Sequence, residues 1–165
     1  PMWSPVANKI AYVSETNSTS DIYLMDDDGS NIKRLTNDTY IKSNVSWSPD
    51  GRYILFVSRH SCWDPVDLLK HCSDAMEKRE ASEELDPDIY DPEIYIVDTR
   101  QDNPEPSQLT HNSVLDEDPV WSPDGSKIAF VSYLDGDAEI FTMSATGSNQ
   151  QRLTNNIYED VNPSW

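Results

Sequence analysis

A five-residue motif that occurs twice is the feature that most constrains the fold of this chain. Residues 47–51 read Trp-Ser-Pro-Asp-Gly, and residues 121–125 repeat the motif letter for letter. Trp3 begins a shorter copy of the motif, and Trp165 occupies the equivalent repeat position at the other end of the chain. Trp3 and Trp47 are 44 residues apart, as are Trp121 and Trp165, whereas Trp47 and Trp121 are 74 apart. A period near forty residues predicts a stack of repeated structural units.

Each repeat carries the same series of short segments after its tryptophan. An apolar run comes first, then a run led by an acidic residue, and then a Leu-Thr pair. The apolar runs are 10–13, 54–57 and 128–131, the acid-led runs are 21–25, 93–97 and 139–143, and the pairs are 35–36, 109–110 and 153–154. Runs this short and rich in β-branched and aromatic residues are typical of strands, and their apolar character on both faces indicates a sheet covered on both sides.

These segments predict a four-stranded antiparallel meander in each repeat. In the Ser-Pro-Asp-Gly unit, proline presets the turn and glycine accepts the left-handed conformation before the next strand. Four-stranded meanders at this period are propeller blades, which bury their faces against their neighbours. We therefore expect an all-β domain over 1–165, with blade 1 at about 1–46, blade 2 at about 47–120 and blade 3 at about 121–165. The tryptophans expected in its core are Trp3, Trp47, Trp121 and Trp165.

The composite motif resembles the TolB-type, WD-like β-propeller repeat. The resemblance rests on the tryptophan motif together with Asp-Gly-Ser-Asn and Arg-Leu-Thr at 28–31 and 34–36, and their counterparts at 147–149 and 152–154. The first repeat departs from it at Val6-Ala7, where the others have Asp-Gly. The family implies a closed propeller, commonly of six or more blades. Three blades would then be part of a longer propeller, or several chains would complete a ring as a homo-oligomer.

The second repeat is 30 residues longer than the others, and the extra length lies almost wholly at about 61–90. Asp64 followed by Pro65 has the residue types of a helix start, so we expect a helical insertion in blade 2. Trp63 lies in this insertion and breaks the period. It is therefore a candidate aromatic contact for a partner.

The two cysteines of the chain, Cys62 and Cys72, both lie in the insertion. An isolated pair ten residues apart suggests a disulfide that staples the loop in an oxidising compartment. Free thiols and a metal site with His60 and His71 are the alternatives, although the spacing matches no common zinc module. Three sequons, at Asn17, Asn37 and Asn44, are candidate glycosylation sites if a glycosylating cell secretes the protein.

The net charge of −18 narrows the choice of partner. It argues against nucleic acid and against anionic membrane surfaces, both of which require basic patches. It favours divalent cations or basic proteins. Apolar runs stay far below the ~20 residues of a membrane span.

The sequence lacks the residue patterns of common catalytic sites. It has no Gly-x-Ser-x-Gly nucleophile elbow and no glycine-rich phosphate loop. The loops before the tryptophans are instead acidic, and we expect them at one end of the innermost strands. They could hold a cation such as Ca²⁺, with Asp116, Asp118 and Asp160 as weak metal candidates, or they could bind a basic peptide. The binding candidates are Asp118, Glu159 and Asn162, together with Trp63.

Fold and composition together predict a non-enzymatic extracytoplasmic module that binds proteins or assembles with itself. Its expected location is extracellular, on the cell surface or periplasmic. The alternative function is the propeller segment of a larger serine peptidase or hydrolase, where it would gate access to a catalytic domain.

Overall fold

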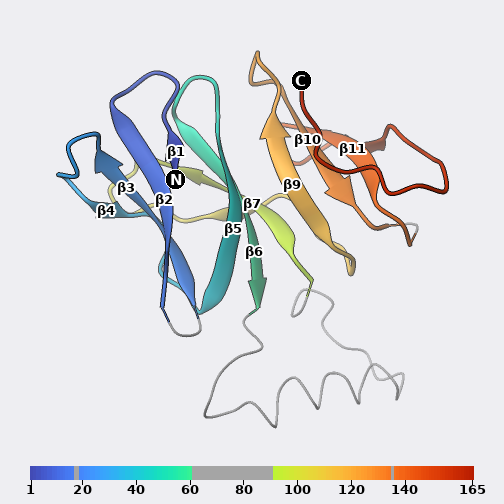
Figure 1. Ribbon diagram of the computed structural model, residues 1–165, viewed down its shortest axis with the longest axis horizontal. Helices are drawn as coiled ribbons and strands as arrows, with labels where there is room; N and C mark the ends of the chain where they lie inside the picture. Colours follow the sequence, from blue (N-terminus) through green and yellow to red (C-terminus); the bar gives the residue numbers. More distant parts are fainter. Residues whose placement is uncertain (17–18, 61–90, 135) are drawn as a thin grey trace, which may run out of the picture.

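The computed structural model describes residues 1–16, 19–60, 91–134 and 136–165. These residues form three four-stranded antiparallel sheets arranged side by side (Figure 1). The all-β fold with three propeller blades is thereby confirmed. The insertion at 61–90, with its expected helix, lies outside the described residues. Within the described ranges, no helix has the length and apolar character that crossing a membrane requires.

The strands of each sheet follow one another in chain order, so every blade is a meander. Blade 1 holds β1 (Met2–Trp3), β2 (Lys9–Glu15), β3 (Ser20–Asp26) and β4 (Lys33–Arg34). Blade 2 holds β5 (Tyr40–Trp47), β6 (Tyr53–His60), β7 (Glu93–Asp98) and β8 (Ser107–Gln108). Blade 3 holds β9 (Asp116–Trp121), β10 (Lys127–Ser132), β11 (Glu139–Ser144) and β12 (Gln151–Arg152).

The tryptophans end the first strands of blades 2 and 3 rather than beginning them. Residues 40–46, which we expected in blade 1, pair with β6 and so belong to the second sheet. Residues 116–120, expected in blade 2, pair in the same way with β10 in the third sheet. The boundaries differ because ladder hydrogen bonds join backbone groups, and they form whether or not the side chains are apolar.

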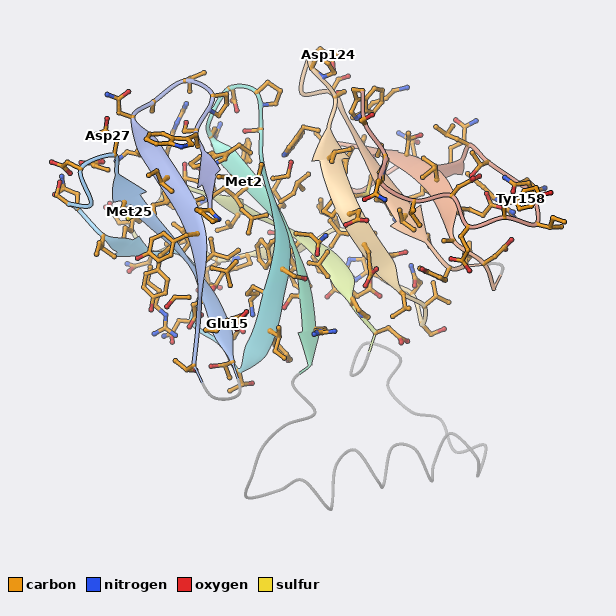
Figure 2. All side chains as sticks on the ribbon, viewed as in Figure 1. Met2, Glu15, Met25, Asp27, Asp124 and Tyr158 are labelled. Carbon is orange, nitrogen blue, oxygen red and sulfur yellow. The ribbon has the colours of Figure 1, made fainter. Side chains whose placement is uncertain are left out.

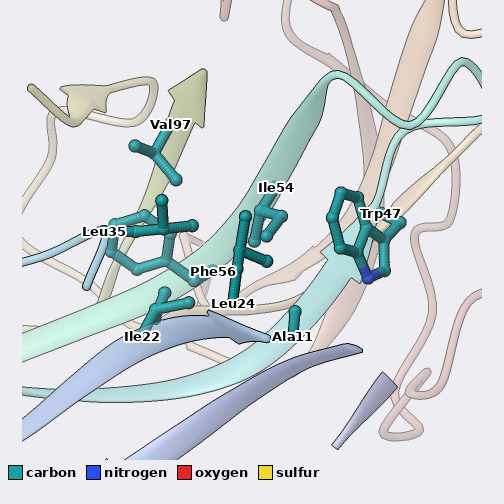
Figure 3. Packing of buried hydrophobic residues seen from close by; sticks show 8 residues of the cluster. All are labelled: Ala11, Ile22, Leu24, Leu35, Trp47, Ile54, Phe56 and Val97. Atoms are coloured by element: carbon teal, nitrogen blue, oxygen red, sulfur yellow. The ribbon is translucent and has the colours of Figure 1, made fainter. Parts of the chain in front are cut away.

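Two hydrophobic clusters fill the spaces between the blades. One cluster joins blades 1 and 2 and contains Ala11, Ile22, Leu24, Leu35, Trp47, Ile54, Phe56 and Val97 (Figure 3). The other joins blades 2 and 3 and contains Leu55, Ile94, Leu109, Trp121, Ile128, Phe130, Phe141 and Met143. Alternate residues of β6 enter different clusters, because successive side chains of a strand point to opposite faces. The blade 2 sheet is therefore buried on both sides.

The four tryptophans differ sharply in burial. Trp47 and Trp121 are only 8% and 9% exposed, as expected for core residues. Trp3 is 63% exposed and Trp165 is 54% exposed, so the expectation of a core position is wrong for these two. The reason is the neighbouring sheet. Trp47 packs among side chains of blade 1, whereas the described part of the chain places no such second sheet over Trp3 or Trp165.

The Trp-Ser-Pro-Asp-Gly turns form as their residues predict. In the first turn, the Ser48 hydroxyl and the Arg52 backbone N–H both donate to Oδ1 of Asp50, at 2.6 and 3.0 Å. The Gly51 N–H donates to the Ser48 carbonyl at 2.9 Å, and Gly51 has φ of 65°. Glycine suits this position because a Cβ disfavours positive φ. These turns lie at one end of the blades, where Figure 2 labels Asp124.

Candidate functional site

The candidate site is built on β-bulges in the innermost strands β5 and β9. In β5 the pairing with β6 shifts register between Ser43 and Ser46, so Asn44 and Val45 form the bulge. In β9 the pairing with β10 shifts at the position of Asp118 and Pro119. A bulge bends its strand and re-aims one side chain. It therefore directs the same repeat position outward in both blades.

The bulge residues Asn44 and Asp118 share an unusual backbone conformation with Asn162, which holds the same repeat position. Asn44, Asp118 and Asn162 each stand three residues before a tryptophan, and their φ angles are 49°, 50° and 56°. This is the left-handed region, which asparagine and aspartate tolerate better than other residues with a side chain. The sequence does contain a signal for left-handed backbone at this position, because all three repeats place an asparagine or an aspartate there.

Side chains at the bulges connect two blades. The Asn44 amide nitrogen donates a hydrogen bond to Oδ1 of Asp118. Asn44 and Asn162 are exposed and Asp118 is half-buried, so all three side chains are accessible. We call the accessible set Asn44, Glu117, Asp118, Glu159 and Asn162 the inner-strand rim.

Acidic groups of the inner-strand rim gather around Tyr133. Burial raises the pKa of the Tyr133 hydroxyl, and the carboxylates of Glu159, Glu117 and Asp118 raise it further. These three carboxylates therefore all act on the same hydroxyl. Among the sequence-predicted binding residues, the structure thus brings Asp118 and Glu159 into one electrostatic neighbourhood, whereas Trp63 lies outside the described residues. Such a surface attracts a positively charged partner.

Calcium binding by the loops before the tryptophans stays a prediction. Across the described part of the chain, no three carboxylate, histidine or cysteine side chains lie close enough to hold a metal ion. Asp116 and Asp160 each accept a hydrogen bond from an asparagine, Asn112 at 2.7 Å and Asn156 at 2.6 Å. These two carboxylates are therefore held by amide groups at the start of the inner strands.

Asp116 is fully buried, in contrast to Asp118 beside it. Its Oδ2 accepts from Asn112, while its Oδ1 has no hydrogen-bond partner among the described residues. Burial raises the pKa of Asp116, and the nearby Ser132 hydroxyl and Asn112 amide offset part of that rise. A buried carboxyl with one unpaired oxygen favours its neutral form.

Some of the residues predicted to form a disulfide or to carry glycans are described in the structure, and others are not. Cys62, Cys72 and the sequon residue Asn17 lie outside the described residues. Asn37 is exposed in the loop between β4 and β5, and its modification stays a prediction. Asn44 is exposed as well, but its amide is hydrogen-bonded to Asp118, so a glycan there would displace this contact between blades.

Sequence comparison finds relatives among curated proteins, although no family model matches the chain. A TolB homolog of Chlorobium chlorochromatii is 29% identical over 144 residues, which cover 78% of this chain and 32% of that protein. A Tol-Pal system protein TolB of Anaeromyxobacter dehalogenans is 27% identical over 159 residues, 96% of this chain and 30% of that one. The uncharacterised peptidase YuxL of Bacillus subtilis is 37% identical over 79 residues, 47% of this chain and 12% of the peptidase. The chain thus spans about a third of the length of the TolB relatives.

Structural comparison finds the same fold in TolB proteins. TolB from Acinetobacter baumannii superimposes with a TM-score of 0.64 at 26% identity, covering 93% of this chain and 31% of that structure. A protein described as TolB from Agrobacterium tumefaciens gives a TM-score of 0.67 at 24% identity, covering 96% of this chain and 46% of that structure. These similarities, together with the sequence relatives, support a TolB-type β-propeller family for this chain.

Proposed function

We propose that this chain of TolB-type propeller repeats is a non-enzymatic module that binds a basic protein surface through its inner-strand rim. The module would work outside the cytoplasm, in the periplasm or at the cell surface. The names of the relatives support a role in protein interaction, since the Anaeromyxobacter protein is named as part of a Tol-Pal system.

One observation carries the proposal: bulges at the same repeat position of two blades bring the Asn44 amide and the Asp118 carboxylate together. Glu117 and Asp118 come from β9, Glu159 comes from the segment after β12, and all three raise the pKa of Tyr133. Carboxylates that share one surface repel each other, and a cationic partner relieves that repulsion. The described residues offer this surface no compensating lysine or arginine ion pair.

Site-specific photo-crosslinking in the native cell tests the rim as a binding surface. A photoreactive amino acid replaces Glu117 in one variant and Glu159 in another. The matched control replaces Glu105, which is exposed in the loop between β7 and β8. We expect the same protein adduct from both rim positions and none from the control. Equal adducts from all three positions, or none at either rim position, would contradict the proposal.

Charge reversal tests the chemistry of the partner. With the crosslinker at Asn162, we expect Glu117→Lys or Glu159→Lys to abolish the adduct, because a rim charge contributes to steering and to selecting the partner. Glu105→Lys changes the net charge of the protein by the same amount and should leave the adduct unaffected. An adduct that persists in both rim variants would show that the partner does not recognise the acidic groups.

A second candidate function is self-assembly. Both ends of the row of blades expose large apolar side chains, Trp3 on one side and Trp165 with Ile157 and Tyr158 on the other. Exposed apolar surface of this kind drives association. Different surfaces at the two ends would give head-to-tail contacts, which close into a ring or extend into a filament.

A third candidate is the propeller of a larger hydrolase, supported by the similarity to YuxL over 79 residues. The rest of the protein decides this candidate. A gene that continues into an α/β-hydrolase domain with a nucleophile elbow would favour gating over a scaffold role.

A further inference from the structure

A cleft of about 760 Å³ lies between blades 2 and 3 on the side of the Trp-Ser-Pro-Asp-Gly turns. Tyr53 and Leu109 of blade 2 and Trp121 of blade 3 supply apolar walls. Asp50 and Asp124 belong to its lining from the two turns. The volume is within the range of pockets that hold small ligands or peptide side chains. The cleft shares no residue with the inner-strand rim.

The indole N–H of Trp121 is a buried donor without an acceptor. Trp47 and Trp165 follow one rule: Nε1 of Trp47 donates to the Met2 carbonyl at 3.2 Å, and Nε1 of Trp165 donates to the Val120 carbonyl at 3.3 Å. Each acceptor precedes the tryptophan of the neighbouring blade. By this rule Trp121 would donate to the Ser46 carbonyl, but its Nε1 is buried and has no partner among the described residues. Buried donors are rarely left unpaired in native proteins.

The turns beside Trp47 and Trp121 also differ in spacing. A methyl group placed on Gly51 would lie 2.3 Å from Cγ2 of Val6, so the turns of blades 1 and 2 are in close contact. A methyl group on Gly125 would lie 3.7 Å from Cδ of Pro49, so the turns of blades 2 and 3 are further apart. The Trp121 indole lines the cleft beside this more widely spaced pair of turns.

Two aspartates in the lining of the cleft favour a positively charged ligand. Oδ1 of Asp50 accepts from Ser48 and Arg52, and Oδ1 of Asp124 accepts from Ser122 and Ser126. Their Oδ2 atoms accept no hydrogen bond from the described residues. No lysine or arginine belongs to the lining. Arg52 is paired with Asp98 at 2.8 Å and lies 4.7 Å from the centre of the Tyr53 ring. The Ser48 hydroxyl lowers the pKa of Asp50, and Arg100 helps to lower it. The cleft therefore combines a neutral donor, an apolar wall and two available carboxylate oxygens.

We propose that the cleft binds a lysine-bearing peptide segment. A backbone carbonyl of the peptide accepts the hydrogen bond of Trp121 Nε1, and the lysine stem lies along Tyr53 and Leu109. The ammonium group then reaches the free oxygens of Asp50 and Asp124. Lysine suits this arrangement because its methylene stem packs on apolar surface while its charge stays near water. A neutral carbonyl suits the indole because a carboxylate would be repelled by the two aspartates.

Indole N–H resonances in the ¹⁵N-labelled protein test the proposal. Trp121→Phe and Trp47→Phe variants assign the two resonances. The probe is acetyl-Ala-Lys-Ala-amide, compared with the same peptide carrying norleucine or glutamate in place of lysine. We expect the lysine peptide to move the Trp121 indole proton downfield in a saturable manner while the Trp47 resonance stays in place. The norleucine peptide should bind about fivefold more weakly, the contribution of one exposed ion pair.

Three variants separate the contributions to binding. Asp50→Asn and Asp124→Asn keep the Oδ1 acceptor of each turn, and together they should remove the preference for lysine over norleucine. Ala145→Leu fills the cleft from its blade 3 side and should abolish the response to all three peptides. The absence of a saturable shift in the wild type would overturn the proposal, as would an equal response to the glutamate peptide. Movement of the Trp47 resonance alongside that of Trp121 would overturn it too, because it would show non-specific binding.

Discussion

Two aspartates of blade 3 show how the residues around a carboxyl group decide its charge. Asp124 is exposed in a turn and receives hydrogen bonds from Ser122 and Ser126. Asp116 is buried at the start of β9 and has one unpaired oxygen. Hydrogen bonds to the charged form lower a carboxyl pKa, and desolvation raises it. The contributions of these two carboxyl groups to the stability of the fold therefore change with pH in opposite directions.

For Asp124 we predict ionisation down to strongly acidic pH. The Ser122 hydroxyl and the groups of Ser126 lower its pKa from 3.8 to about 2. Because the folded-state pKa is lowered, its contribution to stability is present above pH 3.8 and is lost as the pH falls through about 2. Carboxyl ¹³C resonances followed against pH measure this directly. Ser122→Ala should raise the midpoint, and a wild-type midpoint near 3.8 would contradict the prediction.

For Asp116 we predict the reverse dependence. Burial raises its pKa, so its contribution to stability is complete below pH 3.8 and is lost as the pH rises through the folded-state value. Asp116→Asn keeps an acceptor for Asn112 but carries no charge. The free energy of unfolding, measured with urea, should gain more from this substitution at pH 7 than at pH 4. Asp160→Asn is the matched control, because that residue holds the same repeat position without full burial, and its effect should be smaller.

At the scale of strands and hairpins, two glycines share a backbone conformation but differ in how closely a neighbouring blade approaches them. Gly29 and Gly147 occupy equivalent hairpins before the Leu-Thr pairs, with φ of 82° and 80°. A methyl group on Gly29 would meet no atom within 4 Å, whereas one on Gly147 would lie 2.7 Å from the Leu109 carbonyl oxygen of blade 2. An added methyl group would therefore meet a neighbouring blade at Gly147 but not at Gly29.

We predict that Gly147→Ala destabilises the protein more than Gly29→Ala. Both variants carry the cost of positive φ, which is about 1 kcal/mol or more for a residue with a Cβ. Gly147→Ala adds a clash with backbone that cannot rotate away, and overpacking of this kind typically costs about 1–3 kcal/mol. Chemical denaturation of both variants gives the difference. Equal losses would mean that blades 2 and 3 separate enough to admit the methyl group.

The repeat predicts the strands and turns well because both depend on local residue types. The apolar runs at 54–57 and 128–131 became β6 and β10, and Pro-Asp-Gly gave the turns. The bulges were missed because left-handed backbone leaves no mark on apolar periodicity, although Asn44 and Asp118 carried the signal in their residue types. Local residue types could not show that Trp47 and Trp121, within identical motifs, differ in their hydrogen bonds. That difference lies in the packing of one blade against the next, which no single repeat encodes.

At the scale of the whole molecule, the row of three blades leaves an apolar surface at each end. Trp3 shows this most clearly, since its equivalents Trp47 and Trp121 are buried by neighbouring sheets. Repeat proteins need polar surfaces on their terminal units to stay soluble. Trp3 is not covered in this way by the described residues, and its exposed ring is a surface against which a second copy could pack.

We predict concentration-dependent association of this chain through its end blades. Light scattering across a concentration range should give an average mass that rises above that of the monomer. Trp3→Asp should return the mass toward the monomer, because it places a charge at the exposed face. Ile32→Asp is the control, since Ile32 is also exposed but lies in the hairpin between β3 and β4. A constant monomer mass in the wild type would contradict self-assembly.

The division of β6 between two hydrophobic clusters has a consequence for how substitutions combine. Leu55 and Phe56 are consecutive, yet one packs toward blade 3 and the other toward blade 1. Residues in contact usually show coupled effects, whereas residues without shared partners contribute independently. Mild truncations at these two positions should therefore be additive in a double-mutant cycle. Ile54 and Phe56 share a cluster and should be coupled, so energetic independence along this strand follows the face of the sheet and not the distance along the chain.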